Sequence, residues 1–200
     1  MQPLLQKRSK HGIMLRFLLV ALLAISCSLQ APTAGIQVLG VAQDGGRPQV
    51  GCEKSCCANA PNTQQVAALA VKADSDWILV DATPDFAQQV RQVGSLPAAI
   101  VLTHAHIGHY SGLMQLGREV MGAHHMPVWC SARMASFLRE NGPWSQLVSL
   151  GNIELHEFQD QVAFSPIEGV VMQAIAVPHR DEYSDTFGFS IEVDGIKTLY

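Results

Sequence analysis

The sequence predicts a layered α/β fold in which mixed β-sheets are covered by helices. The segments after residue 34 begin as strands joined by a hairpin and continue as alternating strands and helices, a pattern typical of this class. Hydrophobic residues make up 48% of the 200 residues, which suits one domain with a substantial core.

The domain is expected to open with strands. Ile36–Ala42 is an apolar strand that ends in the turn at 43–46, where two glycines permit positive φ. Gln65–Lys72 and Trp77–Val80 then form a hairpin, with Asp74-Ser75-Asp76 at its turn.

Strand–helix units are expected to follow. A helix begins around Thr83 and Pro84, which suit its cap and first position, and it ends at Gly94. The short β-branched run Ala98–Leu102 is typical of a buried strand, and a helix over 111–121 follows it. The remaining expected elements are a helix at Ser131–Glu140 and strands at Pro127–Cys130, Ile153–Phe158, Val170–Val177, Phe187–Val193 and Lys197–Tyr200.

The first 34 residues are expected to form a signal peptide and spacer outside the fold, leaving the domain at 35–200. Four basic residues precede the apolar segment Phe17–Ile25, which is too short for a comfortable membrane span. A lipoprotein anchored at Cys27 is the second interpretation, and an uncleaved N-terminal anchor is the third. We therefore expect an exported protein, periplasmic or extracytoplasmic, that meets the membrane only through this signal or a lipid at Cys27.

Charge limits the classes of partner. Charged residues make up 15% of the chain and the formal net charge is −4. No basic run follows the N-terminus, which argues against a nucleic-acid groove because such a groove needs clustered Lys and Arg. The expected partner is a small-molecule substrate.

Three histidines fall within six residues directly after the strand expected at Ala98–Leu102. His104 and His106 are two residues apart, so in an extended chain they point the same way and can reach one ion. His109 lies where a helix begins and faces a neighbouring position. Neutral imidazoles suit zinc, iron, copper or nickel, so the spacing predicts a metal site.

The cysteines form a weaker signal. Cys52, Cys56 and Cys57 cluster in a loop rich in Gly and Pro. In an exported protein, a disulfide within this cluster and a structural zinc site are both open interpretations. Cys130 stands alone and is expected to be a small buried hydrophobic residue.

The segment Thr103–His109 resembles the His-x-His-x-Asp-His motif of the metallo-β-lactamase superfamily. Within that superfamily, segments 38–49, 77–85 and 111–119 are similar to the branch of coenzyme PQQ synthesis protein B. The resemblance covers roughly residues 36–200. It implies an αββα sandwich with its metal at the end of the central sheets.

The resemblance also implies roles for single residues. His104 and His106 would bind a first metal, and His109 would bind a second. The third ligand of the first metal should be a histidine after a later strand, and His179 fits this place. Asp81 would be the acid that orients the histidine loop, although it is equally suited to cap the next helix.

The sequence departs from the superfamily pattern at two places. Gly108 stands where the motif has an Asp that binds the second metal and helps to orient the attacking water. The acidic residue that bridges the metals would fall beyond Tyr200. Because the chain stops within a strand, we expect a sandwich truncated at its C-terminal side.

Together these features predict a metal-dependent hydrolase that activates water on an ester, amide or phosphodiester. One or two zinc ions are expected, with iron or manganese as alternatives, and His109 and Asp81 would assist catalysis. An alternative within the enzymes is a role in PQQ or quinone-cofactor biosynthesis. A non-catalytic metal-binding protein is the alternative from another class, and Gly108 favours it.

Overall fold

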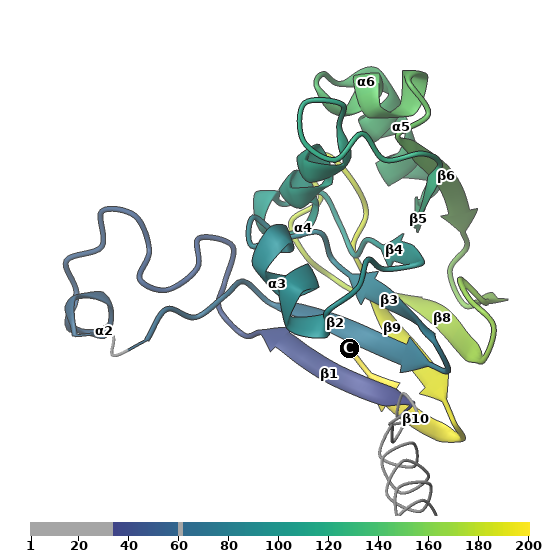
Figure 1. The fold of residues 1–200 in the computed structure, drawn as a ribbon, viewed down its shortest axis with the longest axis horizontal. Helices are drawn as coiled ribbons and strands as arrows, with labels where there is room; N and C mark the ends of the chain where they lie inside the picture. Colours follow the sequence, from purple (N-terminus) through teal and green to yellow (C-terminus); the bar gives the residue numbers. More distant parts are fainter. Residues whose placement is uncertain (1–33, 60–61) are drawn as a thin grey trace, which may run out of the picture. The chain divides into compact units, whose positions relative to one another are not determined.

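Two β-sheets face each other in the structure, a computed structural model that describes residues 34–59 and 62–200 (Figure 1). The first sheet has the strand order β1-β2-β3-β4-β5-β6, and the second has the order β10-β9-β8-β7. The first sheet consists of β1 (Gly35–Gly40), β2 (Ala68–Ala73), β3 (Asp76–Val80), β4 (Ala99–Val101), β5 (Met126–Ser131) and β6 (Ile153–Phe158). The second consists of β7 (Ala163–Phe164), β8 (Val170–Ala176), β9 (Phe187–Val193) and β10 (Ile196–Leu199).

Strand direction decides where the site is built. The neighbours β1, β2 and β3 are antiparallel, whereas β3, β4, β5 and β6 run parallel to one another. Parallel strands bring their carboxyl ends to one edge of a sheet, so the loops that follow β3 and β4 lie side by side. The second sheet is antiparallel throughout.

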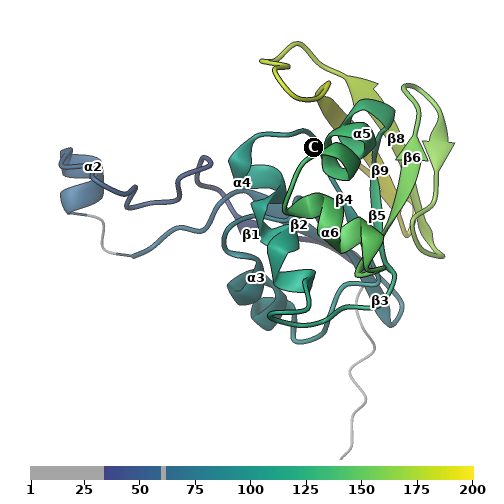
Figure 2. The same cartoon turned by 90° about the horizontal axis from the view of Figure 1, so that it is seen from above.

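Helices cover the face of the first sheet that is turned away from the second, an arrangement seen from above in Figure 2. In β2, Ala68 and Ala70 pack into the helix-side core, whereas Leu69 and Val71 pack between the two sheets. Burial on both faces explains why this strand is apolar without alternation. The helical segments are α2 (Ser55–Ala58), α3 (Phe86–Val93), α4 (Ile107–Tyr110), the 3₁₀ helix η1 (Ser111–Leu116), α5 (Ala132–Glu140) and α6 (Trp144–Ser149).

The prediction of a layered α/β fold is confirmed. The described residues contain a helical layer and two sheets, which are three of the four layers of an αββα sandwich. The predicted strands at Ile153–Phe158 and Phe187–Val193 have the observed bounds, and α5 lies within the predicted helix at Ser131–Glu140.

The helix predicted over 111–121 is wrong. The chain forms α4 before it and then a 3₁₀ helix that ends at Leu116. Gly112 donates its N–H to the carbonyl of Ala82 at 2.8 Å, and a Cβ at Gly112 would lie 2.1 Å from the carbonyl oxygen of Thr83. Because of this close contact with the loop after β3, the segment does not form the α-helix that its apolar periodicity predicts.

The helix predicted from Pro84 begins two residues later, at Phe86. Thr83 does not cap it; its hydroxyl accepts from the N–H of Asp85 at 3.0 Å and donates to Gln89 Oε1 at 2.7 Å. Gly94 ends the helix in the left-handed region, as predicted. The short elements α2, α6 and β7 were not predicted.

The proposed signal segment, with Cys27, lies outside the described residues. Within the described residues, no helix is both long enough and apolar enough to cross a membrane.

Candidate metal centre

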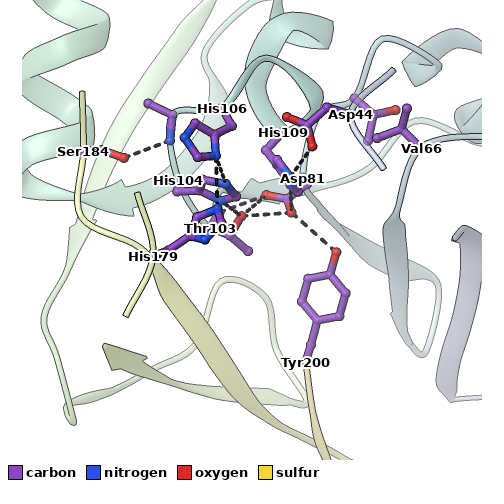
Figure 3. Close-up of polar contacts among 12 residues, drawn as sticks. Asp44, Val66, Asp81, Thr103, His104, His106, His109, His179, Ser184 and Tyr200 are labelled. Carbon is purple, nitrogen blue, oxygen red and sulfur yellow. Dashed lines mark hydrogen bonds and ion pairs between the residues drawn. The ribbon is translucent and has the colours of Figure 1, made fainter. Parts of the chain in front are cut away.

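Three histidines from two loops converge beside the carboxyl end of β4 (Figure 3). His104 and His106 belong to the loop between β4 and α4, whereas His179 belongs to the loop between β8 and β9. The Nδ1 atom of His106 lies 2.9 Å from Nε2 of His104 and 3.2 Å from Nε2 of His179. The structure therefore brings together the three residues expected to hold the first metal.

Thr103 and Asp81 determine which nitrogen of His104 carries a proton. The Asp81 carboxylate accepts from the Thr103 N–H at 2.9 Å and from the Thr103 hydroxyl at 2.9 and 3.0 Å. Because the hydroxyl has given its one proton to Asp81, its oxygen accepts from Nδ1 of His104 at 2.8 Å. Nε2 of His104 is then left with a lone pair that faces the other two imidazoles.

Glu182 acts on His106 in the same way. Its Oε2 lies 3.1 Å from Nε2 of His106, and a carboxylate only accepts, so this nitrogen carries the proton. The Nδ1 atom of His106 then carries a lone pair. It faces the lone pair on Nε2 of His104, and the two nitrogen atoms lie 2.9 Å apart. Two facing lone pairs repel each other unless a cation lies between them.

The donor set fits a zinc ion. Zn–N bonds of about 2.0–2.1 Å in a tetrahedral site separate two ligand nitrogens by roughly 3.3 Å, and the structure has 2.9 and 3.2 Å. Burial, with the charges of His109, His106 and His179, lowers the pKa of His104 to about 3. His104 is therefore neutral at ordinary pH, as a metal ligand must be.

Asp81 connects the loop after β3 with the histidine loop. It is fully buried and adopts a positive φ of 67°, and besides Thr103 it accepts from Nδ1 of His109 at 2.7 Å. Asp85, not Asp81, lies at the N-cap of α3. Asp81 therefore contacts the histidine loop through Thr103 and His109 and does not cap α3.

His109 lies beside the three converging histidines without joining them. Its ring centroid is 4.2 Å from that of His104, and its Nε2 atom lies 3.5 Å from Oδ1 of Asp44. Burial alone lowers the pKa of His109, but the hydrogen bond and charge of Asp81, with Asp44, raise it above its usual value. The position agrees with the neighbouring place that the spacing predicts.

A cleft of about 770 Å³ opens over these histidines. The loop between β1 and β2 forms one wall, to which it contributes Asp44 and the cysteine cluster. Arg47, Lys54 and Arg180 line the same cleft and contribute positive charge to its wall.

The cysteine cluster forms a second group of ligand atoms. The sulfurs of Cys52, Cys56 and Cys57 lie within 4.8 Å of one another, and all three are free thiols. The hydrogen bond between Cys52 and Cys57 raises the pKa of the first thiol and lowers that of the second. Cys130 is buried, as expected, and burial raises its pKa to about 12.

Sequence reasoning missed several residues around the histidines. Besides Thr103 and Glu182, Ser184 accepts from the N–H of Ala105 at 2.8 Å and so fastens the β8–β9 loop to the histidine loop. Single hydroxyl and acidic residues in loops carry no spacing signal. Asp44 could have been found, because it follows the first strand in a turn with two glycines, where sites are often built.

Comparison with known proteins places the chain in a family. A sequence profile described as the beta-lactamase superfamily domain matches residues 76–200. The chain belongs to the beta-lactamase superfamily. Coenzyme PQQ synthesis protein B of Cupriavidus necator is 32% identical over 190 residues, which cover 78% of this chain and 61% of that protein. The same protein of Azoarcus sp. (strain BH72) is 33% identical over 159 residues, covering 68% and 49%.

The predicted resemblance to the branch of PQQ synthesis protein B is thus confirmed. The chain spans less than two thirds of the length of these superfamily relatives.

Solved structures of the superfamily share the fold. The Zn²⁺-bound PqqB from Methylobacterium extorquens has a TM-score of 0.70 at 22% identity, covering 82% of this chain and 64% of that one. A diphosphatase from the PhnP family has a TM-score of 0.62 at 22% identity, covering 78% and 61%. These similarities establish the metallo-β-lactamase fold.

Proposed function

We propose that this protein is a metal-dependent hydrolase that holds one zinc ion with His104, His106 and His179. The observation that carries the proposal is the pair of facing lone pairs on His104 and His106, 2.9 Å apart, with their protons held on the outer nitrogens. Such outer partners orient metal-binding histidines and raise their basicity. The Zn²⁺ bound to PqqB of Methylobacterium extorquens supports the choice of metal.

A zinc ion held by these residues would supply a water whose pKa is lowered from 15.7 toward ~7 and would polarise a substrate oxygen. His109 supplies the nearest group that exchanges protons. Asp81 holds its Nδ1–H, so its Nε2 faces the cleft, where it accepts a proton or, when protonated, donates a hydrogen bond to the substrate. Asp81 thereby orients two histidines at once, His109 directly and His104 through Thr103.

The substrate we propose is a small anionic ester, such as a phosphodiester. The cleft volume of about 770 Å³ lies within the range of about 300–1,000 Å³ found for small-molecule sites. Lys54 and Arg180 line it, and their charge attracts an anion. A related fold belongs to a diphosphatase, which supports phosphorus chemistry. Nucleic acid is not part of the proposal.

A role in PQQ or quinone-cofactor biosynthesis is the second candidate function. The identity of 32% to coenzyme PQQ synthesis protein B supports it. A histidine-bound iron and an oxidative step would then replace zinc and hydrolysis. The native metal and the oxygen dependence of turnover separate these two functions.

The proposal includes export of the protein by residues 1–34, with lipidation at Cys27 as its second form. Cell fractionation of the whole chain tests it. A periplasmic product with a shortened N-terminus supports export, and a full-length product in the cytoplasm contradicts it.

Substitution of the histidines tests the hydrolase. We expect His104→Ala and His179→Ala each to lose about one equivalent of metal relative to the wild type, together with hydrolysis of phosphodiester and ester probes. His124→Ala, at an exposed histidine outside the cleft, is the control and should keep both. Metal content equal to the wild type in both site variants would overturn the proposal. Because each count is a difference, zinc held by the cysteine cluster cancels.

A further inference from the structure

The loop between β8 and β9, residues 177–186, carries the third ligand of the proposed site, His179. The other two ligands, His104 and His106, each have an outer partner that holds the ring. Within the described part of the chain, Nδ1 of His179 has no such partner, and the residue is exposed. The position of His179 therefore depends on how its loop is held.

Even-numbered residues of this loop contact the histidine loop. Oε2 of Glu182 accepts a hydrogen bond from Nε2 of His106 at 3.1 Å. The hydroxyl of Ser184 accepts from the N–H of Ala105 at 2.8 Å (Figure 3). These two contacts fasten the loop on the side of the metal centre.

Odd-numbered residues of the same segment contact α5. The Arg133 guanidinium donates to the carbonyl oxygen of Asp181 at 2.8 Å, and its second Nη atom lies 3.5 Å from the Asp181 carboxylate. The hydroxyl of Ser131, the N-cap residue of α5, donates to the carboxylate of Asp185. The loop is thus held from two opposite sides, by the histidine loop and by the first turn of α5.

The helix α5 is a firm support for this loop. Its residues Met134, Ala135 and Leu138 are buried in the helix-side core. Phe137 carries the ring of Tyr183 at a centroid distance of 5.4 Å, which is a third contact with the loop. Because packing that involves no metal ligand holds the helix, the loop keeps its arrangement before an ion arrives. Such preorganisation strengthens binding, since less freedom is lost when the ion binds.

We propose that α5 positions the third metal ligand, with Arg133 as the positioning residue that fastens the loop near His179. The proposal rests on the proposed function, because it needs an ion at His104, His106 and His179. Arg133 is not a ligand, and it does not line the cleft. It acts through Asp181, two residues beyond the exposed ligand in the chain.

The zinc affinities of two arginine variants test the proposal. Arg133 and Arg139 both belong to α5, their side chains are 49% and 47% exposed, and each lies near a carboxylate. Arg139 pairs with Glu157 of β6 and not with the loop. We expect Arg133→Ala to weaken binding of the zinc equivalent that His104→Ala removes by about 10-fold, the lower end of the range for groups that support metal ligands. Arg139→Ala is the matched control and should keep the wild-type affinity.

Two further measurements separate positioning from a loss of stability. Urea unfolding of the metal-free proteins should give equal midpoints for both variants, because exposed ion pairs contribute little. Backbone hydrogen exchange over residues 179–185 should be faster in metal-free Arg133→Ala than in metal-free Arg139→Ala, and zinc should remove the difference. Arg133→Lys, which can still donate to the carbonyl of Asp181, should recover part of the affinity.

The outcomes separate this proposal from the proposed function. If His104→Ala loses one equivalent but Arg133→Ala binds zinc as tightly as Arg139→Ala, positioning by α5 is overturned and the metal site stands. A lower affinity that accompanies a lower urea midpoint, without faster exchange over residues 179–185, also overturns it. If His104→Ala loses no metal, the proposed function falls and positioning falls with it.

A second variant covers the case in which Arg133→Ala fails to fold. Tyr183→Ala removes an exposed side chain and with it the ring contact with Phe137. We expect weaker zinc binding and faster exchange over residues 179–185 in this variant as well. Wild-type zinc affinity in Tyr183→Ala would then overturn the proposal.

Discussion

At the residue scale, the metal centre depends on protons held outside it. Thr103 and Glu182 each hold the outer N–H of one histidine, and neither is a proposed ligand. Asp81 supports both Thr103 and His109 from a fully buried position. The orientation of these two imidazoles therefore follows from oxygen atoms of Thr103 and Glu182 that accept their outer N–H groups.

Asp81→Asn should disturb the centre although Asp81 is not a proposed ligand. The amide turns a donor toward groups that already donate, and it leaves buried hydrogen-bonding groups unpaired. We expect zinc affinity to fall about 10–100-fold and the free energy of unfolding to fall by ~1–3 kcal/mol. Chelator competition and urea unfolding measure the two effects.

Asp76→Asn, at an exposed hairpin position, is the control for this substitution. Unchanged zinc affinity in Asp81→Asn would show that the buried carboxylate does not orient the histidines.

The lowered pKa of His104 predicts a pH dependence in the metal-free protein. Its pKa of about 3 lies below the ordinary value of 6.5, so between these values the unfolded chain binds a proton that the folded chain does not. The free energy of unfolding should therefore fall as pH is lowered from 6.5 toward 3. His104→Gln should show a shallower slope in urea unfolding between pH 6.5 and 4.5, and an equal slope would contradict the lowered pKa.

At the scale of elements, the 3₁₀ helix η1 holds the histidine loop against the loop after β3. Its Gly112 approaches Ala82 and Thr83 so closely that no side chain fits. The backbone of His109 also pairs there, because its carbonyl accepts from the N–H of Ala82 at 2.9 Å. The 3₁₀ helix that replaces the predicted α-helix therefore also helps to position His109.

Gly112→Ala should destabilise the fold strongly, because its Cβ would lie 2.1 Å from a backbone oxygen. Overpacking of this kind costs about 1–3 kcal/mol or more, and urea unfolding measures it. Ser111→Ala is the neighbouring control. Its buried hydroxyl makes no hydrogen bond within the described residues, so its loss should cost little. Equal stability of the two variants would contradict the close approach.

The elements that the sequence predicts well are those whose burial follows a simple pattern. Phe187–Val193 is bounded by turn residues, and its local pattern predicts a strand without knowledge of its neighbours in the fold. The segment after Ser111 carries apolar residues at Leu113 and Leu116, a spacing that suits either an α-helix or a 3₁₀ turn. Only the contact of Gly112 with another loop decides between them, and such a contact is not readable from local sequence.

At the scale of the whole molecule, the centre joins loops from both sheets. His104 and His106 follow a strand of the first sheet, whereas His179 and Glu182 follow a strand of the second. The packing between the sheets, where β2 and β9 meet, sets the distance between these loops. The three histidines can therefore form one site only in the folded two-sheet core.

The same fact limits what the sequence could predict of the site. The spacing of His104, His106 and His109 indicates a metal site without any fold. His179 became identifiable only through the resemblance to the superfamily, because it lies 73 residues from His106. Glu182 was not identified, since its contact with His106 depends on which loops meet in space.

In the proposed metal centre, His104, His106 and His179 bind one ion through Nε2, Nδ1 and Nε2, respectively. Anomalous diffraction at the zinc edge, from crystals of the zinc-loaded protein, tests it most directly. We predict a peak about 2.0–2.1 Å from each of the three nitrogens. An anomalous map with no peak at the three histidines would contradict this assignment, whether zinc is then found only at the cysteine cluster or nowhere.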